Sequence, residues 1–316
     1  MIFLKEFFEM SFEIILALFS GVVFATGGVG YKVGANGNVR PIQCATFLSV
    51  VGVIGFTIMG WNEWKSLSMF ALVNGVIVGF MQYVVISLLR TALKLGPLSP
   101  AWCAVSLGFI PVIIYSALSC GETLTVYKYL SIAATIGAIV SASFSSPEGE
   151  VVKHSVRDKI FYGIILVLLL VTNCSLPLSL KICSRVMIPG SDIPTSEACG
   201  NPMLAIVYFM ILLCGVIDLT VGKKWVFNRY AFLGGGLLAF GASFGYWLQL
   251  FLVGRAPAVI VFAMSNTVSI LATALISVFV LREKITKSWY FTIGFSILAI
   301  LLNTDSLISF LLRFFC

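Results

Sequence analysis

Gly121-Glu122-Thr123-Leu124-Thr125 joins two long apolar runs, and Arg282-Glu283-Lys284-Ile285-Thr286 joins two more about half a chain length later. In each stretch a threonine follows the glutamate by three residues, and an apolar run containing aromatic residues comes next. Pro97 and Pro257 each precede an apolar run, and nearly the same number of residues separates these two prolines as separates the two glutamates. Self-similarity at so long a period indicates two copies of one structural unit. We therefore predict a tandem duplication.

The composition excludes an ordinary soluble domain. Of the 316 residues, 59% are hydrophobic and 10% are charged, whereas soluble domains carry about 25% charged residues. The mean hydropathy is +1.06. Apolar stretches of about 20 residues, the length that a membrane-spanning helix needs, recur along the chain. The short alternating strands of an outer-membrane barrel are not seen. We expect an all-α, multi-pass integral membrane protein, in a plasma or inner membrane.

Ten apolar stretches are predicted to be transmembrane helices. They cover residues 12–31, 42–61, 69–89, 101–120, 126–144, 160–180, 203–222, 231–253, 258–281 and 287–305. A charged segment rich in turn-forming residues, 145–159, separates the fifth stretch from the sixth and predicts a linker between repeats 1–144 and 160–316. Because each repeat holds an odd number of helices, we expect the two copies to have opposite orientations, as in many secondary transporters.

Basic residues favour one side of this membrane arrangement. The loops on the side of Lys32, Arg90 and the linker hold more lysine and arginine than the opposite loops. The positive-inside rule then places both termini outside the cytoplasm. The same bias explains the net charge of +7. We expect no nucleic-acid binding, because no soluble basic domain is predicted to carry it.

Cysteine and histidine usage gives little sign of metal or redox chemistry. Cys183 and Cys199 are expected in a loop from Lys181 to Pro202, where either a disulfide or two free thiols would fit an oxidising compartment. The single histidine, His154, cannot complete an ordinary zinc site with the scattered thiols. The sequence contains no G-x-S-x-G motif of serine hydrolases, no H-E-x-x-H motif of zinc proteases and no phosphate-binding loop. We expect no metal, no cofactor and no enzyme activity.

The fourth predicted span opens with the run Thr91–Pro100, contains Pro111 and ends at the Gly121-Glu122 junction. Together with the two five-helix halves, this pattern resembles the drug/metabolite transporter superfamily, with its paired EamA-type domains. The second copy departs from the pattern, because Arg282 replaces the junction glycine and Ala272 stands where the first copy has Pro111.

A narrower likeness concerns the substrate class. The run Gly245–Phe251 in the eighth span and the pair Tyr31-Lys32 at the end of the first are similar to the sugar-uptake branch related to rhamnose and glucose carriers. The resemblances imply a secondary active transporter, monomeric or homodimeric, that moves a small polar metabolite by alternating access, coupled to H⁺ or Na⁺. A sugar-like solute or an amino acid is expected. A drug or metabolite exporter and a non-transporting membrane receptor or assembly factor are the alternatives.

Polar side chains within the spans indicate where a solute would bind, because burying them in hydrocarbon is costly. Gln82 and Tyr83 in the third span correspond in the repeat to the neighbourhood of Tyr246 and Trp247 in the eighth, and such positions meet near the midplane of inverted halves. Interhelical hydrogen bonding is the alternative explanation. The predicted substrate-binding residues are Lys32, Gln82, Tyr83, Trp102, Tyr246, Trp247, Gln249 and Asn266.

Charged residues near the ends of the predicted spans could serve either transport or contact with the lipid headgroups. Lys32 follows the run Gly27-Gly28-Val29-Gly30, which allows another backbone to come close, and its ammonium either reaches the headgroups or faces a cavity. Glu13 and Asp218 are candidates for a coupling proton if burial raises their pKa.

The two junction glutamates, Glu122 and Glu283, have a structural explanation instead. We attribute them to helix-end electrostatics together with capping by Thr125 and Thr286.

Overall fold

The computed structural model describes residues 2–95, 104–122, 124–143, 156–188, 190–223, 225–279 and 287–302. Within these residues the regular structure is helical, apart from one isolated antiparallel bridge between Met187 and Pro194. The all-α prediction is confirmed. Trp102, Glu283 and most of the predicted linker lie outside the described residues.

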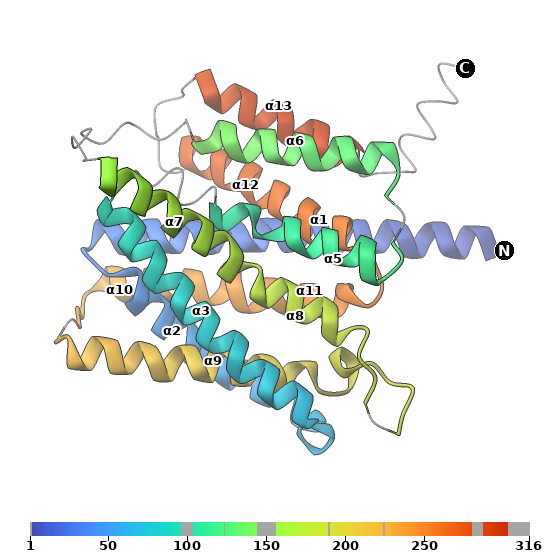
Figure 1. Cartoon of the computed structure of the whole chain (residues 1–316), viewed down its shortest axis with the longest axis horizontal. Coiled ribbons are helices and arrows are strands. Elements are labelled where there is room, and N and C mark those ends of the chain that lie inside the picture. The colour runs from blue at the N-terminus through green and yellow to red at the C-terminus, as the bar shows by residue number, and fades with distance from the viewer. Residues whose placement is uncertain are drawn as a thin grey trace.

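Most helices lie along the long axis of the molecule (Figure 1). The first half contains α1 (Ile2–Asn36), α2 (Pro41–Met59), η1 (Glu63–Ser66), α3 (Met69–Leu95), η2 (Leu107–Phe109), α5 (Ile110–Ser119) and α6 (Val126–Ser143). The second half contains α7 (Val156–Asn173), α8 (Ser175–Cys183), α9 (Thr195–Val221), α10 (Arg229–Ala239), η3 (Phe240–Phe244), α11 (Gly245–Val253), η4 (Val259–Met264), α12 (Ser265–Phe279) and α13 (Lys287–Leu302).

Seven of the described helices are long and apolar enough to cross a membrane. They are Phe12–Asn36, Pro41–Met59, Met69–Ala92, Ile160–Cys183, Thr195–Val221, Arg229–Val253 and Val259–Ile276. Three shorter apolar helices cover Ala104–Ser119, Val126–Ser141 and Tyr290–Leu302. Helices of this number and hydropathy make the chain an integral membrane protein. The count of ten spans stays a prediction.

The outer surface of the bundle is apolar. Leu118 is 82% exposed, Val221 81% and Met69 73%. In water, exposed apolar surface costs about 25 cal/mol per Å², whereas lipid tails remove this cost. The exposed side chains therefore suit a hydrocarbon surrounding.

Glycines bring α1 and α10 into close contact. A Cβ atom on Gly30 would lie 2.6 Å from the Gly234 carbonyl oxygen, and one on Gly234 would lie 2.7 Å from the Gly30 carbonyl oxygen. Real Cβ atoms do not come this close, so each position needs a residue without a side chain. Small residues commonly allow such contact between membrane helices. The close approach predicted from the glycine-rich run is confirmed.

Helix α2 packs antiparallel against α9. Gly52 of α2 lies beside the ring of Tyr208, whereas Gly60, at the end of α2, lies beside Asn201 near the start of α9. The residue numbers rise along one helix as they fall along the other. The two helices therefore run in opposite directions.

Helix α6 packs antiparallel against α13, and the two lie next to each other in Figure 1. The Ser131 hydroxyl donates to the Ala299 carbonyl at 2.9 Å. Further along α6, Gly137 lies beside the ring of Phe295. In both helix pairs that join the two halves, α2–α9 and α6–α13, the helices therefore run antiparallel.

The connections between helices gather at two opposite ends of the bundle (Figure 1). The first, which we call the Lys181 end, holds residues 60–68, 120–122, 124–125, 184–188, 190–194 and 254–258. The second, the Arg90 end, holds residues 37–40, 222–223 and 225–228.

Candidate functional site

An open cavity of about 230 Å³ lies between α2 and the helix formed by α10, η3 and α11, where its lining residues Val51, Met59 and Phe240 are exposed on the outer surface of the bundle. We call it the α2–α11 cavity. Its lining residues are Val51, Gly52, Gly55, Phe56, Met59, Ala239, Phe240, Ser243, Phe244 and Trp247. The rings of Phe244 and Trp247 are stacked with their centroids 5.5 Å apart. Drug-sized ligands occupy pockets of about 300–1,000 Å³, so this space suits a smaller solute.

A π-helical turn, η3, shapes one wall of this cavity. Such a turn holds one residue more than an α-helical turn and often occurs at functional sites. Ser243 lies in the turn and Trp247 follows it by four residues. Residues four apart project from one face of a helix. Ser243 and Trp247 therefore face the same space.

Tyr208 of α9 lies behind the cavity. Its ring stacks on Phe56 at a centroid distance of 5.5 Å, and the residue is 2% exposed. The Tyr208 and Ser243 hydroxyls interact with each other, and neither has another hydrogen-bond partner. Each buried hydroxyl is therefore only partly satisfied, and a buried polar group without any partner costs about 1–3 kcal/mol. A ligand that bonded to these hydroxyls would recover this cost.

Three predicted binding residues lie on α11. Trp247 lines the cavity. Tyr246 packs edge to face against Phe24 of α1, with ring centroids 5.1 Å apart. Gln249 is 4% exposed, and its amide oxygen has no hydrogen-bond partner. Gln249 does not line the cavity. It is a second buried polar group on the same helix with an unsatisfied hydrogen-bonding atom.

Two other predicted amides bond within the protein. Gln82 on α3 donates from Nε2 to the Ser175 hydroxyl of α8 at 3.2 Å. Asn266 donates from Nδ2 to the Phe262 carbonyl, one turn earlier in the same helix, at 2.8 Å. The Gln82–Ser175 hydrogen bond joins two helices, as expected if the polar residue serves helix packing instead of solute binding. Neither contact by itself indicates a ligand.

The remaining candidates are spread over the chain. Tyr83 is partly buried, with its ring 6.5 Å from that of Phe80 on α3. Lys32 and Glu13 are partly buried on α1. None of these candidates lines the α2–α11 cavity.

Asp218 forms an ion pair near the Arg90 end. Its Oδ2 atom lies 3.6 Å from Nη1 of Arg90, which connects α9 with α3. The two side chains are 24% and 29% exposed. A partly exposed pair of this length is weak, on the order of 0–1 kcal/mol.

Glu122 forms a shorter and more buried ion pair at the Lys181 end. Its Oε1 atom lies 2.6 Å from Nζ of Lys181, and these side chains are 13% and 2% exposed. The Ala258 backbone N–H donates to Oε2 at 2.9 Å, and Lys181 donates to the Val253 carbonyl at 3.4 Å. One network thus joins the α5–α6 junction, α8 and the α11–η4 connection.

This network corrects two sequence-based predictions. Lys181 was expected to begin a loop, but it lies buried in the last turn of α8. Glu122 was assigned to the end of its own helix with Thr125 as the cap, but besides Ser116 of α5 its side chain has partners, Lys181 and Ala258, from the other half of the chain. Burial alone would raise the pKa of Glu122. Hydrogen bonds from Lys181 and the Ala258 N–H, with the Lys181 charge, lower its pKa below the ordinary value.

The predicted loop from Lys181 to Pro202 is also shorter than expected. Cys183 ends α8 and Cys199 lies within α9, so the connection covers only residues 184–194. Both cysteines are fully buried and free. The expected loop placement was therefore wrong, and of the two alternatives the structure has the free thiols.

Comparison with known proteins identifies the second half. Residues 181–304 match the EamA-like transporter family. This part of the chain is therefore similar to EamA-like transporter domains. The resemblance to EamA-type drug/metabolite transporters is thereby confirmed, whereas the narrower likeness to the rhamnose and glucose carriers is not supported.

Solved structures support the fold over nearly the whole length. One of them, described only as "Crystal structure of protein", aligns with a TM-score of 0.73 over 95% of this chain and 99% of that chain. The sequence identity is 13%, so this likeness concerns the fold alone. No curated protein matches the chain significantly in sequence.

The region that matches the EamA-like family, residues 181–304, supplies the polar groups that sequence reasoning missed. Tyr208 lies within a strongly apolar helix, so its aromatic ring gives no sign of a functional hydroxyl. Ser243 lies in the run Gly241–Gly245, whose small residues signal close packing rather than binding. Only the structure shows that the two hydroxyls meet beside one cavity with no partner except each other.

Proposed function

We propose that the protein is a secondary active transporter that moves a small polar metabolite across the membrane by alternating access. The hydroxyls of Tyr208 and Ser243, which have only each other as partners and are buried in apolar helices beside an aromatic cavity, carry this proposal. Polar groups that are costly inside a membrane commonly mark a substrate pathway. The EamA-like domain supports transport rather than catalysis or reception of a signal.

The lining of the α2–α11 cavity favours an uncharged solute. None of the ten lining residues is charged, so a solute with a net charge would lose hydration without gaining a partner. Hydroxyls and stacked aromatic rings suit a sugar-like molecule, and an amino acid without net charge is the second choice. Uptake and export both fit this site.

We further propose that the two halves are inverted repeats, 1–144 and 160–316, which together form ten spans. A two-fold axis in the membrane plane reverses the direction of each helix, so corresponding helices that meet must run antiparallel. An axis along the membrane normal would make them parallel. The antiparallel pairs α2–α9 and α6–α13 support the first arrangement.

The ion pairs at the two ends fit alternating access. The Glu122–Lys181 pair is short and buried, whereas the Arg90–Asp218 pair is longer and about a quarter exposed. We assign the first pair to a closed gate at the Lys181 end. Opening that end requires separating Glu122 from Lys181 and from the Ala258 N–H.

Tyr208→Phe and Ser243→Ala should each weaken transport about 3- to 10-fold, because each removes one hydrogen bond worth about 0.5–1.5 kcal/mol. Both substitutions keep the shape of the site nearly unchanged. The measurement is counterflow exchange of radiolabelled sugars and amino acids by purified protein in liposomes, with solutes first selected by thermal shift. Tyr129→Phe, at a 59% exposed position of α6, is the matched control.

Normal exchange by both variants would remove Tyr208 and Ser243 from the substrate site. Solute binding without any exchange in the wild type would support the receptor alternative instead.

Asp218→Asn tests the proposed proton coupling. We expect uptake driven by a pH gradient to fall at least several-fold while counterflow exchange continues, because only the driven reaction moves a proton. Stability should change by less than about 1 kcal/mol, since the Arg90 pair is partly exposed. Asp192→Asn, in the connection between α8 and α9, is the control. Unchanged gradient-driven uptake would assign Asp218 to structure alone.

A further inference from the structure

Hydrogen bonds join the two connections at the Arg90 end to each other. The Asn228 amide donates to the Gly37 carbonyl at 2.9 Å. Gln43 of α2 donates from Nε2 to the Val226 carbonyl at 2.5 Å and accepts from the Val226 N–H at 3.0 Å. Arg40 lies midway between Gly37 and Gln43 in the sequence. These hydrogen bonds therefore hold Arg40 beside the second connection.

Arg40 is a cation with an unsatisfied donor. Its Nη1 atom is buried and makes no hydrogen bond. Within the described part of the chain, Arg40 forms no ion pair either. A guanidinium group carries five N–H donors in a fork that matches phosphate and carboxylate oxygens, and a buried donor without an acceptor is destabilising. Arg40 therefore favours an anion that the described chain does not supply.

The second connection adds two exposed cations, Lys223 and Arg229. Arg229 is held above the ring of Tyr230, with Cζ 4.9 Å from the ring centroid, and Tyr230 packs against Gly37 of the first connection. None of the described residues of the two connections is acidic. Three cations thus share one surface on which the described residues place no counter-charge. We call Arg40, Lys223 and Arg229 the basic surface.

Aromatic side chains place the basic surface at the edge of the hydrocarbon layer. The rings of Trp225 and Phe227 are stacked with their centroids 5.7 Å apart. Trp225 donates from Nε1 to the Thr220 hydroxyl at 3.3 Å, and Phe227 is 71% exposed. Tryptophan is typical of the level of the lipid headgroups, where one end of its ring system meets apolar chains and the other meets polar groups. An anion bound here would therefore belong to a lipid.

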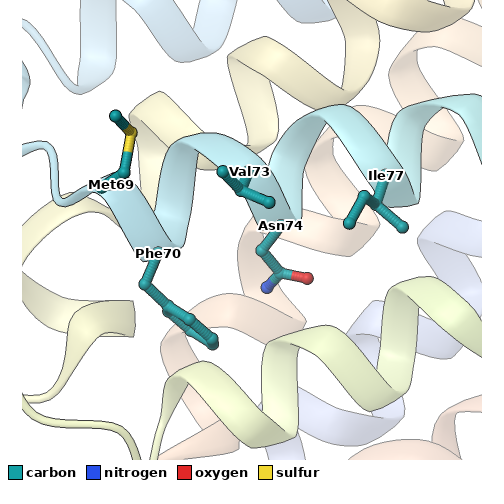
Figure 2. Close-up of a pocket in the computed structure, with 5 residues that line it drawn as sticks. All are labelled: Met69, Phe70, Val73, Asn74 and Ile77. Atoms are coloured by element: carbon teal, nitrogen blue, oxygen red, sulfur yellow. The ribbon is translucent and has the colours of Figure 1, made fainter.

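An outer groove of α3, near the Lys181 end, gives a contrast (Figure 2). Its volume is about 370 Å³. Its lining residues are Met69, Phe70, Val73, Asn74 and Ile77. None of them is charged, and the Asn74 amide already donates to the Ser179 hydroxyl at 2.8 Å. This groove offers apolar contact for acyl chains but no cation for a phosphate.

We propose that the basic surface binds the phosphate of one anionic phospholipid, as a site separate from the solute pathway. Arg40 would donate from its buried Nη1 to a phosphate oxygen, and Lys223 and Arg229 would supply further positive charge. Basic clusters at the ends of membrane helices attract anionic headgroups. A zwitterionic headgroup carries its own cation, which these three cations would repel. The acyl chains of the lipid would lie against the apolar outer surface beside Phe227.

The test compares the retention of phosphatidylglycerol, which is anionic, and phosphatidylcholine, which is zwitterionic. Full-length protein in detergent is mixed with equal amounts of both lipids and passed through size-exclusion chromatography, and the retained lipid is counted by mass spectrometry. We expect the wild type to retain phosphatidylglycerol selectively. Arg40→Gln should lower this selectivity about fivefold, as the loss of one cation beside an anionic headgroup predicts. The control is Arg185→Gln, which removes an exposed arginine at the Lys181 end and should leave the selectivity unchanged.

The same chromatography shows whether each variant is folded. A phosphatidylglycerol with a photoreactive headgroup gives a second reading on the wild type alone. Labelling of peptides that contain Arg40 or Phe227 would support the site, whereas labelling confined to other peptides, such as those of the α3 groove, would contradict it.

Four further results would overturn the proposal. The wild type could retain both lipids equally, or folded Arg40→Gln could keep the full selectivity. Arg185→Gln could lose as much selectivity as Arg40→Gln, which would assign the effect to net charge. Displacement of the lipid by an excess of inorganic phosphate would show a site for free anions instead of a lipid.

Discussion

Lys181→Met should lower the free energy of unfolding by about 3–5 kcal/mol, because it leaves the Glu122 carboxylate buried without its cation. Lys181 is 2% exposed and lies 2.6 Å from Glu122, whose side chain is 13% exposed, so water can replace the lost partner only in part. Methionine retains most of the apolar stem of lysine. The measurement is thermal unfolding of the purified protein in detergent, followed by tryptophan fluorescence.

The double variant Lys181→Met with Glu122→Gln should regain part of this loss, because neither partner is then charged. Lys65→Met, at an exposed position of η1 near the same end, should unfold like the wild type. A loss under about 1 kcal/mol for Lys181→Met would show that the pair is not buried in solution, contrary to the closed-gate assignment.

The same ion pair predicts a dependence of stability on pH. The pKa of Glu122 is lowered from its ordinary value of 4.5. A carboxyl group with a lowered pKa stabilises the folded state above its unfolded pKa and loses this contribution as pH falls through the folded value. Stability should therefore fall below about pH 4.5 more steeply in the wild type than in the Glu122→Gln variant. Equal slopes would exclude the pair as the cause.

Gly234→Ala should destabilise the protein by about 1–3 kcal/mol through overpacking. Its new Cβ would lie 2.7 Å from the Gly30 carbonyl, so α1 and α10 would have to separate. Gly236 gives a control on the same helix, because a Cβ there meets nothing within 4 Å. Gly236→Ala should be neutral or slightly stabilising, since alanine favours a helix by up to about 1 kcal/mol over glycine. Both are measured by thermal unfolding in detergent.

The two alanine variants therefore have opposite expected signs despite the identical chemical change. If both variants lower stability equally, close contact between α1 and α10 is not the cause of the Gly234→Ala effect.

The helical regions could be predicted from the sequence because hydropathy varies over the length of a whole helix. The predicted span 42–61 corresponds to α2, Pro41–Met59, where proline opens the helix. The predicted span 231–253 corresponds to α10 through α11. The glycine-rich run before Lys32 also predicted a close helix contact correctly, because residues without side chains allow two helix backbones to approach each other.

The site was harder to predict, because it depends on which side chains meet across the bundle. Glu122 and Lys181 are distant in sequence, and nothing in either segment specifies the other as its partner. Cys183 and Cys199 were placed in one loop because the end of the sixth span and the start of the seventh were predicted too far apart. Gln82 looked like a binding residue, yet its amide bonds to Ser175. Trp247 was predicted and lines the cavity, but its neighbours from α2 were not.

The π-helical turn η3 has a consequence for motion inside a hydrocarbon medium. Every backbone N–H and C=O there must keep a partner, so a helix cannot simply break to move. A π turn offers another route, since shifting its extra residue along the helix exchanges one set of internal hydrogen bonds for another. Such a shift would rotate the side chains that it passes by about 100° around the axis. Ser243 lies in this turn, so a one-residue migration could present or withdraw its hydroxyl while the helix stays intact.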